Sequence, residues 1–189
     1  MKSVFCTLFV FLVTTTSANA NLIVNGSFET GTLSSWSSTN TIIVSSNGSH
    51  GGSYNAVFSQ VSPPSYDTLS QTVSASPGTY NLDFWLYYND ATGQEFKVVF
   101  DGVTVVDLTS QLNSGGGAYI HVVENGITAT DLNPVLTFES QNFVNYMRLD
   151  DVNLVAAIPE PSSLSLAGFG ALGFIANEIR RRYSSRIQA

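Results

Sequence analysis

From Asn21 to Ala157 the chain alternates between apolar and polar residues, and turn-forming residues interrupt the alternation every few positions. Successive side chains of a strand point to opposite faces of a sheet, so this period of two is typical of strands with one buried face. No stretch of the segment keeps a helical period for three turns. The segment is therefore predicted to fold into short strands, separated by the Gly, Pro, Asn and Asp residues that punctuate it.

Ten strands are expected, at residues 22–24, 41–45, 54–59, 68–74, 79–88, 95–100, 103–108, 119–124, 135–139 and 145–155. The clearest hairpin lies in "KVVFDGVTVVDL", where Asp101-Gly102 is a two-residue loop that favours a type I′ turn. The sequence offers no crossover helix between these strands. The predicted fold class is therefore all-β, an antiparallel β-sandwich.

The longest expected strand, "TYNLDFWLYYN", has two different faces. One face is an apolar stripe suited to the core, made of Tyr80, Leu82, Phe84, Leu86 and Tyr88. The other face carries Asn81, Asp83, Trp85 and Tyr87. Because the CH-rich face of a sugar matches an aromatic face, Trp85 and Tyr87 are candidate ligand-binding residues for a glycan. The alternative is that a loop or the second sheet covers both rings.

Two segments, "NLIVNGSFETG" and "YMRLDDVNLV", place carboxylates within apolar runs. A regular strand cannot bury the apolar residues on both sides of Asp150 and Asp151, so a β-bulge or an edge position is expected there. A buried carboxylate needs a partner, either a cationic side chain or a hard divalent cation such as Ca²⁺. Glu29, Asp150 and Asp151 are the candidate ligands of a structural Ca²⁺, beside the glycine-rich "SHGGSY" of residues 49–54. The alternative is that these acids lie exposed at strand ends.

Four segments, in chain order, resemble the landmarks of galactose-binding-like jelly-roll domains, which include several families of carbohydrate-binding modules. They are "NLIVNGSFETG", "SHGGSYNAVFS", "LSQTVSASPGTYNLDFWLYY" and "LDDVNLV", and they span residues 21–156. The resemblance implies a jelly-roll β-sandwich. It also implies a structural calcium held by Glu29, by Asp150 or Asp151, and by the main chain near residues 51–53.

The charge of this segment limits its partners. Residues 21–157 contain two cations, Lys97 and Arg148, against twelve acidic residues, a net charge of −10. No nucleic-acid partner is expected, because a domain of this charge is repelled by nucleic acid and by anionic membrane surfaces.

The sequence shows no catalytic constellation, and the protein is expected not to be an enzyme. His50 and His121 are its only histidines, which is too few for a zinc site, and no G-x-S-x-G nucleophile motif is present. Asp150 and Asp151 are adjacent on an expected strand. Their side chains should therefore point to opposite faces and form a poor acid/base pair.

The first twenty residues have the three parts of a secretory signal peptide. Lys2 supplies the positive charge, residues 4–13 the apolar run, and Ala18-Asn19-Ala20 the small-residue cleavage site. We therefore expect export by the Sec system and processing after Ala20. Cleavage there would remove Cys6, the only cysteine, and leave a mature chain without disulfides.

The end of the chain, residues 158–189, has a different composition. Pro159-Glu160-Pro161 is followed by the apolar residues 164–176 and by Arg180-Arg181-Arg182. Thirteen residues span about 20 Å as a helix, less than a bilayer core, and extension toward residue 179 approaches a full span. A marginal transmembrane helix is therefore expected at about residues 162–179, with the arginines on the cytoplasmic side.

This tail resembles the PEP-CTERM sorting signal of exopolysaccharide-producing Gram-negative bacteria, which an exosortase processes. The resemblance implies transient anchoring in the inner membrane and processing at the Pro159-Glu160-Pro161 triplet. Two features depart from the pattern: Asn177-Glu178 interrupts the helix end, and seven residues follow the arginines. The alternative is a permanent single-span anchor.

Together these features predict three parts: a signal peptide at 1–20, a β-sandwich at 21–157 and a sorting signal at 158–189. The predicted function is that of an exported, non-enzymatic protein of the cell surface or extracellular matrix, which associates with exopolysaccharide through the sandwich. The alternatives are a purely structural surface or biofilm matrix protein and a polysaccharide-active enzyme.

Overall fold

The computed structural model describes residues 20–39, 42–59, 64–89, 93–109, 111–112, 116–142 and 145–157. These residues form ten strands and no helix: β1 (Ser37–Ser38), β2 (Ile43–Ser45), β3 (Asn55–Phe58), β4 (Asp67–Thr72), β5 (Gly78–Tyr87), β6 (Glu95–Phe100), β7 (Val103–Asp107), β8 (Tyr119–Ala129), β9 (Val135–Gln141) and β10 (Met147–Ala156). The all-β prediction is confirmed for this part of the chain.

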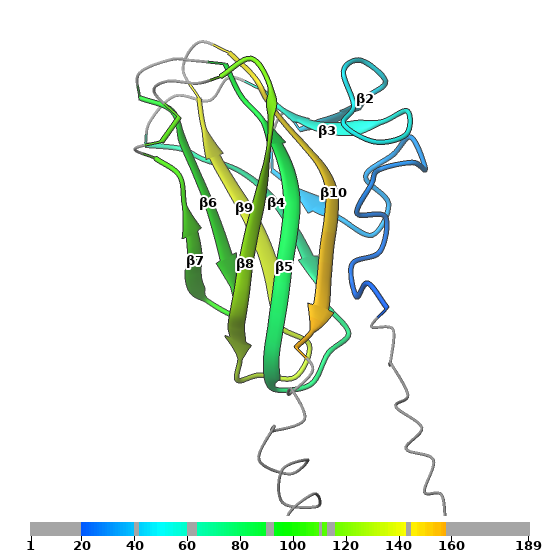
Figure 1. Ribbon diagram of the computed structural model, residues 1–189, viewed down its shortest axis with the longest axis vertical. Coiled ribbons are helices and arrows are strands. Elements are labelled where there is room, and N and C mark those ends of the chain that lie inside the picture. The colour runs from blue at the N-terminus through cyan, green and yellow to red at the C-terminus, as the bar shows by residue number, and fades with distance from the viewer. Residues whose placement is uncertain are drawn as a thin grey trace, which may run out of the picture. The chain divides into compact units, whose positions relative to one another are not determined.

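The strands form two antiparallel five-stranded sheets that pack face to face (Figure 1). Sheet I has the order β1-β4-β9-β6-β7, and sheet II has the order β2-β3-β10-β5-β8. Neighbouring strands in each sheet are mostly distant in the sequence, as in a jelly roll. The predicted sandwich is therefore confirmed, and each sheet keeps one face for the core and one for solvent.

The core follows the period-two pattern of the strands. The largest side chains with less than 2% exposure come from both sheets, from the segment before β1 and from the segment between β7 and β8: Phe28, Phe58, Phe84, Phe96, Phe100 and Phe138, with five leucines and one methionine. Strand β5 shows the alternation most clearly, because Leu82, Phe84 and Leu86 are fully buried while Asp83, Trp85 and Tyr87 are partly exposed. The prediction of which β5 residues face the core is confirmed.

The β6–β7 hairpin also agrees with its sequence signal. Asp101 and Gly102 have φ values of 51° and 78°. A type I′ turn requires positive φ at both central residues, and Asp-Gly meets this requirement at low cost. Asp101 also connects this hairpin to the end of β8, because its carboxylate accepts hydrogen bonds from the backbone N–H groups of Thr130 and Asp131.

Three strand predictions differ from the structure. Residues 22–24 are irregular and lead into a turn rather than forming a strand, although the N–H of Leu22 still donates to the carbonyl of Leu154 on β10 (2.8 Å). Strand β1 was missed because it contains only two serines. Strand β8 continues to Ala129, past an Asn-Gly pair that resembles a turn signal, because a bulge opposite Tyr80 absorbs Gly126 at a φ of 78°.

The expected bulge at Asp150-Asp151 is present. The register of β10 against β5 shifts between Asp150 and Asn153, and Asp151 has a φ of 49°. Strand β10 lies between β3 and β5, so the edge alternative does not apply. The prediction that the two carboxylates point to opposite faces was wrong. The positive φ at Asp151 turns its side chain to the same face as Asp150, and both contact His50.

The chain separates into two compact units, residues 1–156 and 157–189. The sandwich belongs to the first. The predicted signal sequence (except Ala20, which is exposed), the helix at about 162–179, the Pro159-Glu160-Pro161 triplet and Arg180-Arg181-Arg182 lie outside the described residues. Among the residues that the structure does describe, no helix is long and apolar enough to cross a membrane.

Candidate functional site

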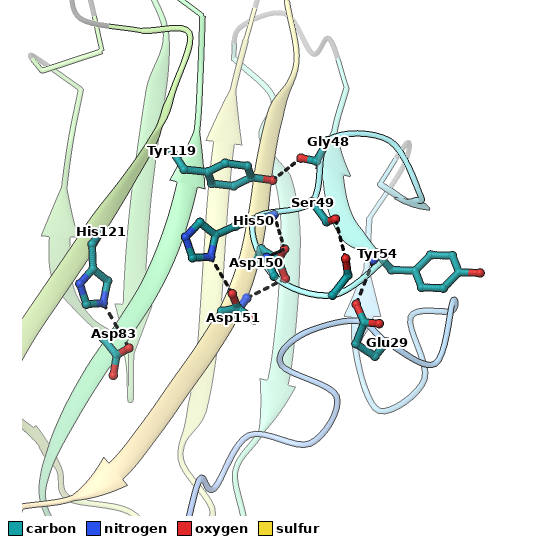
Figure 2. Close-up of polar contacts among 12 residues, drawn as sticks. Glu29, Gly48, Ser49, His50, Tyr54, Asp83, Tyr119, His121, Asp150 and Asp151 are labelled. Atoms are coloured by element: carbon teal, nitrogen blue, oxygen red, sulfur yellow. Dashed lines mark hydrogen bonds and ion pairs between the residues drawn. The ribbon is translucent and has the colours of Figure 1, made fainter.

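The outer face of sheet II gathers aromatic and charged side chains from three neighbouring strands. On β5, Trp85 lies opposite Asp150 of β10 and His121 of β8. One step along the same face, Tyr87 lies opposite Arg148 and Tyr119. Cross-strand neighbours of this kind have adjacent side chains, so the face is crowded with large rings. The loop between β2 and β3, residues 46–54 (the His50 loop), folds over this face (Figure 2).

Trp85 is stacked between two imidazoles. The His50 ring lies 3.8 Å from the Trp85 ring, centroid to centroid, at an interplanar angle of 13°. The His121 ring lies at 4.5 Å and 9°. Each face of the indole is therefore covered by a histidine, one from the His50 loop and one from β8. This arrangement corresponds to the alternative in which a loop covers the Trp85 ring.

Each imidazole has its own carboxylate (Figure 2). His50 Nδ1 lies 2.7 Å from Asp151 Oδ2, and His121 Nε2 lies 3.3 Å from Asp83 Oδ1. Both pairs are partly exposed, with side-chain exposures of 30% and 33% for the first pair and 42% and 31% for the second. The imidazole nitrogens lie in the ring plane, so a contact with a fixed carboxylate restricts the orientation of that plane. The two contacts therefore help to hold both rings parallel to the indole.

The backbone of the His50 loop is held by carboxylates on both sides. Asp150 Oδ2 accepts hydrogen bonds from the N–H groups of His50 (2.8 Å) and Gly51 (3.2 Å). Glu29 Oε1 accepts hydrogen bonds from the N–H groups of Ser53 (2.8 Å) and Tyr54 (2.9 Å). These carboxylates supply acceptors for four turn amides, which need hydrogen-bond partners. The acids therefore fix the loop that places His50 on the indole.

Two glycines of this loop lie in close contact with carboxylates. A Cβ at Gly51 would lie 2.6 Å from Asp151 Oδ2, and a Cβ at Gly52 would lie 2.4 Å from Glu29 Oε1. Gly52 also has a φ of +57°. The missing side chains let two carboxylates approach the main chain closely, which explains the Gly-Gly pair in "SHGGSY".

Asp150 is the buried acid of the site, with 0% exposure. Burial raises the pKa of Asp150 to about 6, although hydrogen bonds from the N–H groups of His50, Asp151 and Gly51 act in the opposite direction. Burial, with a smaller contribution from the charge of Asp150, also raises the pKa of the Tyr119 phenol. The Tyr119 hydroxyl donates to the carbonyl of Gly48 (2.8 Å) and so ties β8 to the His50 loop.

A polar hollow lies on the other side of Asp151. It has a volume of about 420 Å³ and is lined by Asn21, Ile23, Asn25, Gly26, Ser27, Asp151, Val152 and Asn153. The Asn21 side chain closes one wall, since it accepts hydrogen bonds from the N–H groups of Ile23 and Leu154. The start of the sandwich and the β10 bulge thus line one hollow that Asp151 also borders.

The three candidate metal ligands, Glu29, Asp150 and Asp151, lie around the His50 loop. Glu29 and Asp151 approach Gly52 and Gly51, and Asp150 lies beneath His50 and Gly51. Carboxylates beside a glycine-rich main chain are the hard oxygen donors that Ca²⁺ prefers. In the described part of the chain, however, no group of three or more His, Cys, Asp or Glu side chains converges as a metal site would. The acids bind loop N–H groups and His50 instead.

Sequence reasoning placed Trp85 and Tyr87 on this face but missed their neighbours. The sequence excluded His50 and His121 as a zinc site, and nothing in their spacing indicates that they stack on the same indole. Tyr119 and Arg148 join the face only through strand pairing that is distant in the sequence. The period-two pattern of "NYMRLDD" puts Arg148 and Asp150 on one side, and this was the available signal.

Comparison with protein families identifies the tail. The model of the PEP-CTERM protein-sorting motif matches residues 157–182, which include the Pro159-Glu160-Pro161 triplet and the three arginines. The predicted sorting motif is confirmed, and it indicates an exported protein that is sorted at the membrane. No curated protein sequence matches the chain.

Solved structures share the fold of the sandwich. The carbohydrate-binding module TmCBM61 in complex with β-1,4-galactotriose is 21% identical with a TM-score of 0.57, over 73% of this chain and 99% of that chain. Family 16 Carbohydrate Binding Module-2 is 21% identical with a TM-score of 0.54, over 71% and 99%. A cyclase from Fischerella sp. TAU is 14% identical with a TM-score of 0.57, over 76% and 100%. The resemblance to carbohydrate-binding jelly rolls is confirmed at the level of the fold, which does not itself fix a function.

Proposed function

We propose that this protein is an exported, non-enzymatic binding protein that is processed by an exosortase-type enzyme and associates with extracellular polysaccharide through the outer face of sheet II. The observation that carries the proposal is the combination in one chain of a PEP-CTERM motif with a jelly roll shared by carbohydrate-binding modules. The cell surface or extracellular matrix of a Gram-negative bacterium is the proposed destination.

The chemistry of sheet II supports a glycan ligand. Sugar rings bind to proteins through CH contacts with aromatic faces and through hydrogen bonds to planar polar groups. Trp85 has both ring faces covered, so it contributes its edge and fixes the two imidazoles on either side. Tyr87 and Tyr146 stack at 6.2 Å and 12°, and Tyr146 is 38% exposed. The proposed platform is therefore centred on Tyr87 and Tyr146 and bordered by Trp85.

Binding is tested with purified protein on a glycan array and in polysaccharide pull-down assays. Tyr87→Ala and Trp85→Ala should each weaken binding, the first by removing a stacking ring and the second by releasing both imidazoles. Tyr66→Ala is the matched control, because Tyr66 is a partly buried tyrosine whose partners, Glu95 and Lys97, belong to sheet I. Retained binding in both sheet II variants would disprove the proposed face.

We also propose that a structural Ca²⁺ binds beside the His50 loop. Glu29 and Asp151 would be its carboxylate ligands, with main-chain oxygens of the loop, while Asp150 positions the loop from below. The close approach of both carboxylates to Gly51 and Gly52, together with the burial of Asp150, supports this assignment. Ca²⁺ would neutralise acids in a domain that has few cations of its own.

The calcium proposal is tested by thermal unfolding. A chelator should lower the melting temperature of the wild-type protein, and Glu29→Ala should remove the difference between chelated and calcium-loaded samples. Glu139→Ala, an acid on sheet I, should leave that difference in place. An identical melting temperature of the wild-type protein with and without chelator would eliminate the site.

The tail gives a separate test of sorting. Intact mass of the exported protein should show processing after Ala20 and loss of the chain near Pro159–Pro161, with Glu160→Ala accumulating uncut precursor. A full-length carboxyl end on the exported protein would instead favour a permanent anchor. Failure of every glycan to bind a correctly processed protein would favour the purely structural matrix role.

A further inference from the structure

We propose that Arg148 recognises the carboxylate of an acidic sugar unit, so that the outer face of sheet II prefers glycans that contain uronic-acid-type residues over neutral ones. This inference rests on the proposed glycan-binding function and names the class of ligand.

The guanidinium of Arg148 is fixed by two tyrosine rings. Its Cζ lies 4.9 Å from the centroid of Tyr87 and 4.6 Å from that of Tyr146. Attraction between the guanidinium and the two ring faces holds the side chain against the sheet. The group is therefore positioned before any ligand arrives, which reduces the entropic cost of binding.

The His50 loop forms a further wall beside the guanidinium. A Cβ at Gly48 would lie 2.5 Å from Arg148 Nη1, so a larger residue at this position would push the guanidinium out of its place. The Gly48 carbonyl is held by the Tyr119 hydroxyl at 2.8 Å. The loop, β8 and the two tyrosines thus surround Arg148 on a half-buried surface.

Arg148 has no acidic partner among the described residues. The other cation of the sandwich, Lys97, lies 3.0 Å from Glu95 Oε2 on sheet I. The two acids that follow Arg148 on β10 are engaged elsewhere. The Asp150 carboxylate accepts hydrogen bonds from N–H groups of the His50 loop, and the Asp151 carboxylate contacts the His50 ring. Among the described residues, no ion pair or side-chain hydrogen bond engages the guanidinium donors of Arg148.

A carboxylate on a sugar ring fits this arrangement. A planar guanidinium binds a carboxylate through two parallel N–H···O bonds, a geometry that a neutral hydroxymethyl group cannot match. The exposed ring of Tyr146 offers an apolar face to the CH groups of the same sugar. One acidic sugar unit could therefore satisfy both the charge and the ring at once.

Because the rest of the domain is negatively charged, any preference for acidic glycans should depend on Arg148. Residues 21–157 carry a net charge of −10, which repels an acidic polymer at long range. Non-specific attraction therefore cannot produce a preference for acidic glycans. If Arg148 is removed, the remaining field should favour the neutral form of the same polymer.

The experiment compares polygalacturonate and alginate with their fully methyl-esterified forms, which keep the backbone and lose the charge. Affinities are measured for the full chain at fixed salt. Wild-type protein should bind at least one acidic form about ten to one hundred times more tightly than its ester, as expected for a charge-assisted pair. Arg148→Gln should abolish or reverse this preference for the acidic form. Arg148→Lys should keep part of the preference, because lysine keeps the positive charge but cannot form two parallel hydrogen bonds to a carboxylate.

Lys97→Gln is the matched control and should leave the ratio unchanged, because Lys97 lies on sheet I and is paired with Glu95. Circular dichroism and melting temperature establish that each variant is folded. Equal affinity for acid and ester in the wild-type protein, or the wild-type ratio in Arg148→Gln, would overturn the inference while the glycan-binding function stands. Binding to neither form of any polymer would overturn both.

Discussion

The burial of Asp150 makes a quantitative prediction about pH. Its pKa is raised from 3.8 to about 6, mainly by burial. Each pKa unit corresponds to about 1.4 kcal/mol, so ionisation of this one carboxyl in the native state costs about 3 kcal/mol of stability. Because the native pKa is raised, the native state holds the proton more tightly than the unfolded chain does. The stabilisation from this bound proton is complete only well below the unfolded pKa of 3.8, and it is lost as the pH rises through 6.

Asp150→Asn isolates this contribution, because the amide does not titrate. Urea unfolding of both proteins at pH 4 and pH 7.5, in chelator, should show the wild type gaining about 2.5 kcal/mol relative to the variant at the lower pH. Asp101→Asn should show the opposite sign. Hydrogen bonds from Thr130 and Asp131 lower the pKa of Asp101, so the wild-type advantage at that position should fall as the pH decreases.

Calcium provides the second arm of the same experiment. A cation beside the His50 loop would favour the ionised form of Asp150 and so reduce its pH dependence. With Ca²⁺ present, the difference between wild type and Asp150→Asn should therefore change less between the two pH values than it does in chelator. A difference that is independent of pH in chelator would refute the burial argument itself.

Other perturbations test the packing around this site. Gly52→Ala should destabilise the protein by about 2 to 4 kcal/mol in urea unfolding, because its Cβ would lie 2.4 Å from a carboxylate oxygen, whereas Gly102→Ala meets open space and should cost only about 1 kcal/mol of backbone strain. His50→Ala should expose one face of Trp85, which acrylamide quenching of tryptophan fluorescence would detect as greater accessibility; unchanged quenching would contradict the stack. Phe84→Ala should lower stability by about 3 to 5 kcal/mol, since the ring is fully buried between the sheets.

The period of two was sufficient to predict most of the fold. Strand β5 illustrates the reason, because its apolar and polar residues alternate without interruption and local sterics alone assign its two faces. The turn at Asp101-Gly102 was equally local. Residues 22–24 were mistaken for a strand because an apolar triplet does not reveal that Asn21 and Gly26 bond to β10 instead of forming a ladder.

The site was predictable only in part. The acids near Gly51 and Gly52 were identified because they lie within apolar runs of the sequence. A carboxylate buried in such a run needs a hydrogen-bond donor or a cation to offset the cost of leaving water. The stacking of His50 on Trp85 was not predicted. It depends on the loop between β2 and β3 reaching across β10 to contact β5, which is two strands from β3 in the sheet. Contacts of this kind depend on strand order, which a single sequence does not specify.

The positive φ of Asp151 connects the acids to the aromatic face of sheet II. In a regular strand Asp151 would point into the core, and His50 would lose its carboxylate. The positive φ at Asp151 brings that side chain out beside Asp150, so the two acids together hold the ring and the amide of the same histidine (Figure 2). His50 then covers Trp85, while Gly48 of the same loop lies against Arg148. The proposed calcium site and the proposed ligand face share this loop, so we expect Ca²⁺, protons and glycan to be thermodynamically linked at this surface.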